Sequence, residues 1–155
     1  MNNNLFLIDI NNKEHIKLIK DYEKKNNLSN IISYLTSDNS NSIIINEILC
    51  SKDKDGIKDI CFIRAEKDKK TFFIDFVDKN KDIRNKPLIK YAEDYAFKNL
   101  GMEEIFIQAK KDNKRLINNI EEEKFDKLWE EYDIITFIKT KELDKEQGRV
   151  VHGTR

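Results

Sequence analysis

Two carboxylates near the middle of the sequence, Glu47 and Asp75, are the residues best suited to acid–base chemistry. Both stand in segments that are expected to be β-strands and that consist mainly of apolar residues. Apolar surroundings raise the pKa of a carboxyl group toward neutrality, which suits it to the role of general base. Arg64, on the strand between them, would lower both pKa values again, and a Glu-Arg-Asp row is also an ordinary structural charge cluster. The sequence alone leaves both interpretations open, a catalytic base and a structural cluster.

The relative positions of these residues depend on a predicted hairpin. Residues 43–50 and 57–67 are rich in β-branched side chains, and the Asp55-Gly56 pair between them is a strong signal for a two-residue turn. Such a turn predicts that Cys50 lies directly opposite Cys61, at a hydrogen-bonded pair whose geometry does not suit a disulfide. We therefore expect two free thiols, as is usual in a cytosolic protein.

The same register predicts which charged residues share a face of the sheet. It sets Glu47 opposite Arg64, and a second turn near Asp68 sets Asp75 opposite Phe62 on the next strand. Opposite charges that face each other across neighbouring strands stabilise a sheet. Glu47, Arg64 and Asp75 are therefore expected on one face, on three adjacent strands.

The clearest element of secondary structure is an amphipathic helix from Pro87 to Gly101. Apolar residues recur along it at helical spacing, at Leu88, Ile89, Ala92, Tyr95, Ala96 and Leu100. Pro87 suits the first turn of a helix, and Gly101 suits the left-handed conformation in which helices commonly end. A strand with alternating side chains follows at once, around Ile105 and Ile107. Together with the strand that precedes it, this segment forms a βαβ unit.

The segment from about Phe72 to Lys141, with its helix PLIKYAEDYAFKNLG and its closing FDKLWEEYDIITFIKTKE, resembles the core of the GCN5-related N-acetyltransferase (GNAT) family. The resemblance implies an α/β fold of the α+β type, with a mixed, mostly antiparallel sheet of six or seven strands flanked by about four helices. The strands that end near Val77 and begin near Glu104 are then parallel and splayed. The resemblance also implies transfer of an acetyl group from acetyl-CoA to an amine on a small molecule or a protein, with Asp75 or Glu47 as general base.

In that family, the link before the third helix holds the CoA pyrophosphate through main-chain N–H groups at the helix N-terminus. The corresponding link here is NKDIRN, with Asn80, Ile83 and Asn85 where the family has Gln or Arg and two small residues, usually glycines. The β-branched side chain of Ile83 and the charge of Asp82 oppose close approach of a phosphate. The resemblance implies a cofactor site made of Val77, Asn80, Ile83, Arg84, Asn85, Lys86 and Asn113.

A second departure from the family lies at Ile120, in IEEEKF, where many members have a tyrosine that protonates the leaving thiolate. Attack of an amine on a thioester needs mainly proximity and a polarised carbonyl, so loss of this tyrosine slows the reaction rather than forbidding it. The alternative interpretation is a catalytically silent domain of the same fold that serves protein association. The missing glycines favour this alternative, and a test for CoA binding discriminates between the two.

Length and composition limit the classes of function. The 155 residues are expected to form one domain over 1–143, followed by a mobile tail over 144–155. Lys and Arg together number 29, as do Asp and Glu, and this balance argues against nucleic acid as a partner. No signal peptide and no apolar run long enough to span a membrane is present, so a cytoplasmic location is expected. No metal site is expected around His15, and a homodimer is compatible with the sequence.

Overall fold

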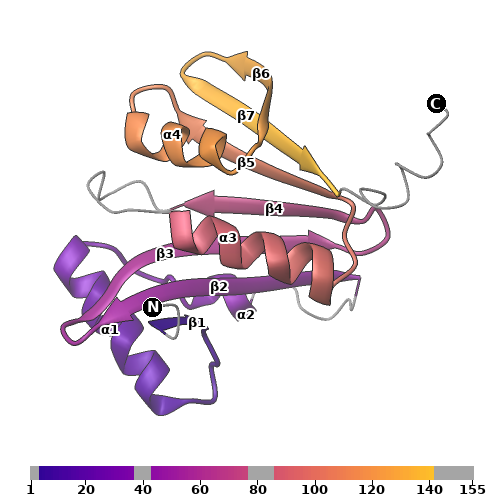
Figure 1. Ribbon diagram of the computed structural model, residues 1–155. Helices are drawn as coiled ribbons and strands as arrows, with labels where there is room; N and C mark the ends of the chain where they lie inside the picture. Colours follow the sequence, from indigo (N-terminus) through magenta and orange to yellow (C-terminus); the bar gives the residue numbers. More distant parts are fainter. Residues whose placement is uncertain (1–3, 37–42, 77–85, 142–155) are drawn as a thin grey trace, which may run out of the picture.

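The computed structural model describes residues 4–36, 43–76 and 86–141, which form a seven-stranded sheet flanked by helices (Figure 1). The strands are β1 (Leu5–Leu7), β2 (Ile44–Asp53), β3 (Gly56–Glu66), β4 (Thr71–Phe76), β5 (Glu104–Lys110), β6 (Asp126–Glu131) and β7 (Ile134–Thr140). Their order across the sheet is β1-β2-β3-β4-β5-β7-β6, and within the described residues β4 and β5 are the one parallel pair. The predicted mixed, mostly antiparallel sheet is confirmed.

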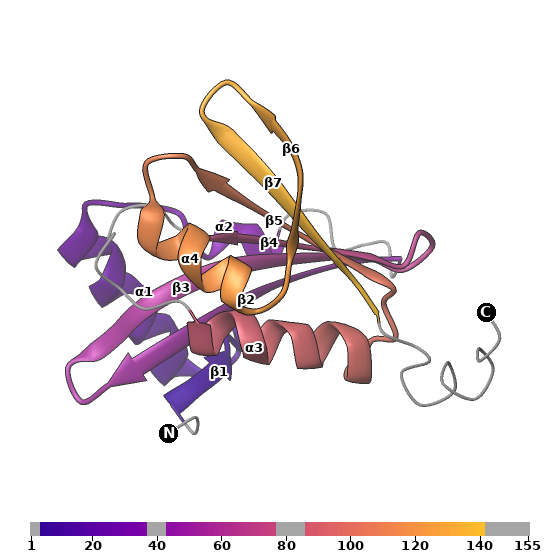
Figure 2. The same cartoon turned by 45° about the horizontal axis from the view of Figure 1, so that its top comes forward.

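Helices cover both faces of this sheet (Figure 2). They are α1 (Lys13–Asn26), α2 (Ser33–Thr36), α3 (Lys86–Asp94) and α4 (Lys114–Glu122). On one face, Ile19 of α1 packs in a core cluster with Ile48 of the sheet. On the other, Leu88 of α3 and Ile120 of α4 pack in a larger cluster with Phe72. We call these the α1–α2 face and the α3–α4 face.

α3 begins and ends close to where the sequence predicts. Pro87 lies in its first turn, and Gly101 has φ = +69° after the helix has ended. The last turn is a π-helix, η2 (Tyr95–Asn99), after which the N–H of Leu100 donates to the main-chain oxygen of Tyr95 at 3.0 Å. The N-terminal end of α3 lies at the same end of the sheet as the C-terminal ends of β4 and β5 (Figure 1).

β4 and β5 separate toward those C-terminal ends. Their parallel pairing ends at Ile74 and Ile107, although β4 extends to Phe76 and β5 to Lys110. β3 holds β4 on one side, and the β6–β7 hairpin holds β5 on the other and turns away from the rest of the sheet (Figure 1). The predicted splay is confirmed.

The predicted register of the β2–β3 hairpin was wrong by one residue. Oδ1 of Asp53 accepts a hydrogen bond from the N–H of Asp55 at 2.8 Å, so the turn begins earlier than expected and Gly56 already lies opposite Asp53. The pairing then shifts again at a bulge between Ser51 and Lys52. A carboxylate that caps its own turn therefore competes successfully with the Asp-Gly signal.

This shift separates the two cysteines. Cys61 lies opposite Leu49, and Cys50 lies opposite Ile60. Each thiol is free and buried, Cys50 in the core cluster of the α1–α2 face and Cys61 in that of the α3–α4 face. The expectation of free thiols is confirmed, but the cause is different: the two side chains point to opposite faces of the sheet.

Trp129 lies on the edge strand β6 of the β6–β7 hairpin and is 57% exposed. The predicted tail over 144–155 lies outside the described residues. In the part of the chain that the structure describes, every helix is too short or too polar to cross a membrane.

Candidate functional site

The separation of β4 and β5 creates the candidate site, because two cavities border the gap. The first, of about 120 Å³, lies beneath α4 and is lined by Asp75, Gln108, Ala109 and Leu116 among others; we call it the splay cavity. The second, of about 560 Å³, lies on the α1–α2 face and is the aromatic pocket described below. Asp75 and Gln108 line both cavities, so these two side chains stand where the cavities meet.

Asp75 lies near the C-terminal end of β4, directly opposite Phe62 on β3 as the sequence predicts. The two flanking residues, Ile74 and Phe76, are buried on the other face, whereas Asp75 itself is exposed. The expectation that apolar residues enclose this carboxylate was therefore wrong. Across the gap, Nε2 of Gln108 donates to Oγ1 of the buried Thr136 at 3.1 Å, which fixes the amide.

Glu47 does not share a face with Asp75, so this part of the prediction was wrong. The register shift sets Glu47 opposite Ile63, on the α3–α4 face. There its Oε2 accepts a hydrogen bond from the hydroxyl of Tyr95 at 3.3 Å. Burial raises the pKa of Glu47, and the Tyr95 hydrogen bond offsets part of that rise. Glu47 lines neither of the two cavities, and its contact joins the end of α3 to β2.

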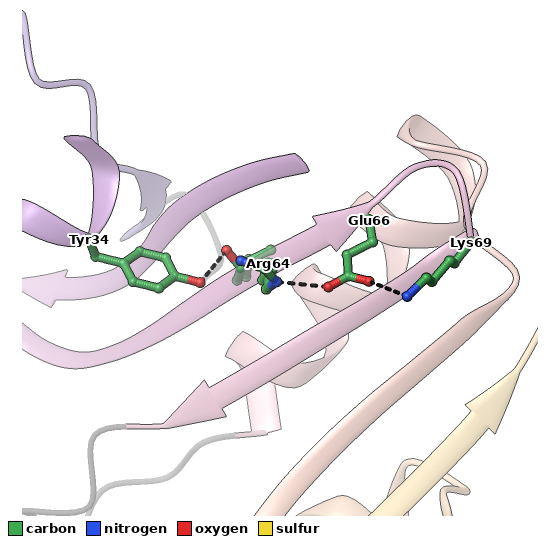
Figure 3. Close-up of polar contacts among 5 residues, drawn as sticks. Tyr34, Arg64, Glu66 and Lys69 are labelled. Carbon is green, nitrogen blue, oxygen red and sulfur yellow. Dashed lines mark hydrogen bonds and ion pairs between the residues drawn. The ribbon is translucent and has the colours of Figure 1, made fainter. Parts of the chain in front are cut away.

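Arg64 shares the α1–α2 face with Asp75, as predicted, but its ion pair is with a different residue (Figure 3). Its Nε donates to Oε2 of Glu66 at 2.9 Å, and Oε1 of Glu66 lies 3.8 Å from Nζ of Lys69. Arg64 lies opposite Phe73, one diagonal step from Asp75 along the β3–β4 pair. The guanidinium of Arg64 thus borders the aromatic pocket, and its ion pair with Glu66 orients it along β3.

Tyr34 connects α2 to the same strand. Its hydroxyl donates to the main-chain oxygen of Ile63 at 2.8 Å (Figure 3), and its ring lies 4.8 Å from that of Phe62, centroid to centroid. Burial raises the pKa of Tyr34 to about 12, with Arg64 lowering it in part and Asp75 raising it. The phenol therefore stays protonated at neutral pH and serves as a wall of the pocket.

Five aromatic rings line that pocket. Phe73 on β4 and Phe106 on β5 stack with centroids 5.4 Å apart and an interplanar angle of 18°. Tyr34 and Phe62 line the pocket from α2 and β3, and Trp129 lines it from β6. The sequence interpretation missed Tyr34, Phe106 and Trp129 as site residues. One signal could have found part of the wall: Phe73 precedes Asp75 by two residues, as Phe106 precedes Gln108, so each strand sets one ring and one polar group on the same face.

A basic groove of about 1070 Å³ runs between α3 and α4 on the other face of the sheet. Its cationic lining consists of Lys86, Lys90, Lys114 and Arg115, and its carboxylates are Glu121 and Glu123. Lys86 also forms an ion pair with Glu122, with Nζ 3.1 Å from Oε1. Because the N-terminus of α3 borders this groove, the partial positive charge of the helix end adds to that of the four cationic side chains. This charge distribution suits an anionic ligand such as a phosphate chain.

Two of the seven predicted cofactor residues are described by the structure. Lys86 lines the basic groove. Asn113 is the N-cap of α4, where its Oδ1 accepts from the N–H of Leu116 at 3.2 Å. The other five lie outside the described residues: Val77, Asn80, Ile83, Arg84 and Asn85. Ile120, at the position compared with the family tyrosine, is a fully buried residue of α4 and forms part of the core.

No cluster of three or more potential metal ligands occurs among the described residues. Carboxylates among the described residues form ion pairs with lysine or arginine instead, as Glu130 does with Lys111 and Lys127. The candidate site thus has two parts. One is the gap between β4 and β5, where Asp75 and Gln108 lie, and the other is the basic groove at the N-terminus of α3.

Comparison with known proteins identifies the fold. No protein-family model matches the sequence, and no curated protein matches it either. Solved structures do match. The Campylobacter jejuni N-acetyltransferase PseH in complex with acetyl coenzyme A aligns with a TM-score of 0.60 at 14% identity, over 88% of this chain and 99% of PseH. A point mutant of the Vibrio cholerae spermidine N-acetyltransferase SpeG aligns with a TM-score of 0.63 at 13% identity, over 94% of this chain and 98% of SpeG.

A probable acetyltransferase from Staphylococcus epidermidis aligns with a TM-score of 0.60 at 19% identity, over 88% of this chain and 98% of its own. Structural similarity at such low identities is a statement about fold, and the fold is that of GNAT acetyltransferases. The strand order and the parallel β4–β5 pair of the described residues agree with this fold.

Proposed function

We propose that this protein is an N-acetyltransferase that transfers the acetyl group of acetyl-CoA to an amine. The observation that carries the proposal is the position of Asp75 and Gln108, which line a cavity on each face of the sheet at the gap between β4 and β5. A donor on one face and an acceptor on the other would meet at this point. The proposal retains the cytoplasmic location expected from the sequence.

The basic groove supports binding of the donor. Acetyl-CoA supplies an activated acetyl thioester, and its phosphates are anions. Lys86 and Lys90 of α3 stand across the groove from Lys114 and Arg115 of α4, and the helix N-terminus adds its own main-chain donors. PseH, which has the same fold, is known in complex with acetyl coenzyme A. The residues present therefore fit this group.

The residues at the gap support the chemistry. In this proposal, main-chain N–H groups beyond the last β4–β5 pair, at Ile74 and Ile107, would polarise a carbonyl placed in the gap. Asp75 would take the proton that an amine loses on acylation, directly or through a water molecule. Its exposure keeps it accessible, and an acceptor in the aromatic pocket would cover it.

Loss of the family tyrosine fits the same proposal. Ile120 occupies the compared position and is buried in the core, and Tyr34 keeps its proton while donating to Ile63. Neither side chain delivers a proton to a leaving sulfur, so this proton comes from solvent. Catalysis then rests on proximity and on a polarised carbonyl, which together account for most of the acceleration of such an acyl transfer.

A pair of variants tests the proposal. Asp75→Asn should lower kcat for acetyl transfer by about a hundredfold or more, because it removes the general base. It should leave the rise in melting temperature caused by acetyl-CoA unchanged, because the donor binds through the groove. Glu47→Gln is the matched control, since this carboxylate lies on the opposite face and lines neither cavity. Equal loss of activity in both variants would contradict the assignment of Asp75.

A catalytically silent domain that serves protein association is the second candidate. The replaced glycines, at Ile83 and Asn85 of the sequence, favour it. It predicts that neither CoA nor acetyl-CoA raises the melting temperature of the protein at any concentration. That result would remove the acetyltransferase proposal and leave the silent domain.

A further inference from the structure

The aromatic pocket leaves large apolar side chains open to solvent. Trp129 is 57% exposed and Leu128 43% exposed, and both line the pocket that the Phe73–Phe106 stack also lines. A core would have covered these groups, and exposed apolar side chains that gather at a hollow mark a binding site for an apolar ligand. The volume of about 560 Å³ suits a small molecule of one or two rings.

The charges of this pocket are few and opposed. Of the described residues that line it, one carries a carboxylate, Asp75, and one carries a cation, Arg64. Glu66 lies beside Arg64 but is already engaged by it and by Lys69. Among the described lining residues, a polyamine with three or more positive charges would find a single carboxylate, and the guanidinium of Arg64 would repel it. The pocket therefore suits one amine group on an uncharged body.

We propose that the acceptor is an arylalkylamine, a primary amine joined by a short chain to an aromatic ring. This inference rests on the proposed function and names its substrate class. The ring lies between the Phe73–Phe106 stack and Trp129, where flat groups pack in offset or edge-to-face arrangements. The amine then points to Asp75 at the gap, where the splay cavity begins.

The acyl transfer is balanced without a further reactant. The neutral amine nitrogen forms a bond to the acetyl carbon while the carbon–sulfur bond breaks. The nitrogen gives its proton to Asp75, which passes it to solvent, and the sulfur leaves as a thiolate that takes a proton from solvent. The products are an N-acetyl arylalkylamine and CoA.

A fluorescence titration tests the binding step by itself. Trp129 is the single tryptophan of the sequence, so the intrinsic tryptophan emission reports on this pocket alone. Phenethylamine, which barely absorbs where tryptophan is excited, should change this emission in a saturable way, and spermidine should not. Absence of any change with phenethylamine would overturn the assignment of the pocket.

Two substitutions sharpen this test. Phe106→Leu removes one ring of the stack but keeps an apolar side chain in place, and it should weaken phenethylamine binding by about tenfold. Tyr132→Asn removes an aromatic group from the turn of the β6–β7 hairpin; this side chain is 90% exposed and does not line the pocket. It should leave binding unchanged. Equal weakening by both variants would contradict the proposed position of the ring.

Activity measurements separate the substrate class from the function itself. With acetyl-CoA as donor, kcat/KM for phenethylamine should exceed that for spermidine by about tenfold or more. Faster acetylation of spermidine would overturn the arylalkylamine assignment and leave the acetyltransferase proposal intact. A fluorescence change with phenethylamine, combined with no transfer and no effect of acetyl-CoA on the melting temperature, would instead remove the acetyltransferase proposal and leave the pocket as a binding site.

Discussion

Nζ of Lys139 on β7 lies 2.7 Å from Oε1 of Glu93 on α3 and 2.7 Å from the main-chain oxygen of Glu123 at the end of α4. Glu93 is almost fully buried, and burial raises the pKa of its carboxyl group while the hydrogen bond from Lys139 lowers it in part. One ammonium group therefore joins β7 to both helices that border the basic groove. Nζ of Lys139 also lies 5.6 Å from the ring centroid of Phe125.

We expect Lys139→Met to lower the free energy of unfolding by about 3 kcal/mol at neutral pH, because it leaves the Glu93 carboxylate buried without its partner. The loss should shrink as the pH falls, since the unpaired carboxyl then takes up a proton. The double variant Glu93→Leu, Lys139→Met should regain most of the loss, because both charges are absent. Denaturant titrations of the three proteins measure this, and a double variant no more stable than the single one would contradict it.

A buried carboxyl at the β2–β3 bulge makes stability depend on pH. Oδ1 of Asp59 accepts from the N–H of Ile60 at 3.0 Å, and no hydrogen-bond partner is found for Oδ2 among the described residues. Burial raises the pKa of Asp59 from 3.8 to about 7. A raised pKa means that its contribution to stability is full below the pKa of the unfolded chain and is lost as the pH rises toward 7.

The loss amounts to at most about 4 kcal/mol, because each unit of pKa shift corresponds to about 1.4 kcal/mol. Asp59→Asn should therefore be more stable than the wild type at about pH 8 and close to it at about pH 4. Asp55→Asn, at the exposed turn of the same hairpin, controls for removal of one negative charge. If Asp59→Asn were less stable than the wild type at both pH values, Asp59 would be ionised and paired rather than neutral.

Local signals in the sequence predicted the elements that frame the site. Pro87 and Gly101 mark the ends of the α3–η2 segment because each favours a backbone conformation that occurs at one end of a helix, whatever surrounds it. The alternating pattern around Ile105 and Ile107 identified β5 for a similar reason. The βαβ unit therefore followed from neighbouring residues alone, whereas its splay was implied by the family resemblance.

The candidate site could not be predicted in the same way, because it depends on contacts between distant segments. The turn that starts at Asp53 shifts the predicted pairing by two residues, which keeps each side chain on its face, and the bulge between Ser51 and Lys52 then shifts the pairing back by one. Because side chains alternate along a strand, the bulge moves Glu47 to the opposite face. The aromatic pocket brings Tyr34 and Trp129 together from opposite parts of the chain. No local spacing relates these two residues, so the sequence could not predict that their rings line the same pocket.

Charge reversal in the basic groove tests donor binding. Lys90→Glu with Lys114→Glu should weaken acetyl-CoA binding by about tenfold or more, because two cations that face the groove become anions. The wild-type affinity should also fall as salt is added, since exposed charges are screened. Lys20→Glu, on the exposed side of α1, is the control for an altered surface charge. Titration calorimetry measures all three, and equal affinity in the groove variant and the wild type would locate the donor elsewhere.

The segment before α3 provides the sharpest test of the family resemblance. Ile83 and Asn85 lie outside the described residues, and the sequence comparison sets them where the family has small residues, usually glycines. The N-terminus of α3 offers unpaired N–H groups whatever precedes it, so weak anion binding persists without those glycines. Ile83→Gly with Asn85→Gly should strengthen acetyl-CoA binding by about tenfold, because main-chain groups can then approach a phosphate closely.

Ile83→Ala separates the two causes of that gain. It removes the β-branched bulk but not the restriction on the backbone, so it should give less of the gain than the glycine pair. Titration calorimetry on the wild type and both variants compares the three affinities directly. Equal gains from Ile83→Ala and from the glycine pair would mean that side-chain bulk alone opposes the phosphate. Absence of binding by all three proteins would remove the acetyltransferase proposal and leave the silent domain, because the α3 N-terminus would then hold no donor even with the family residues restored.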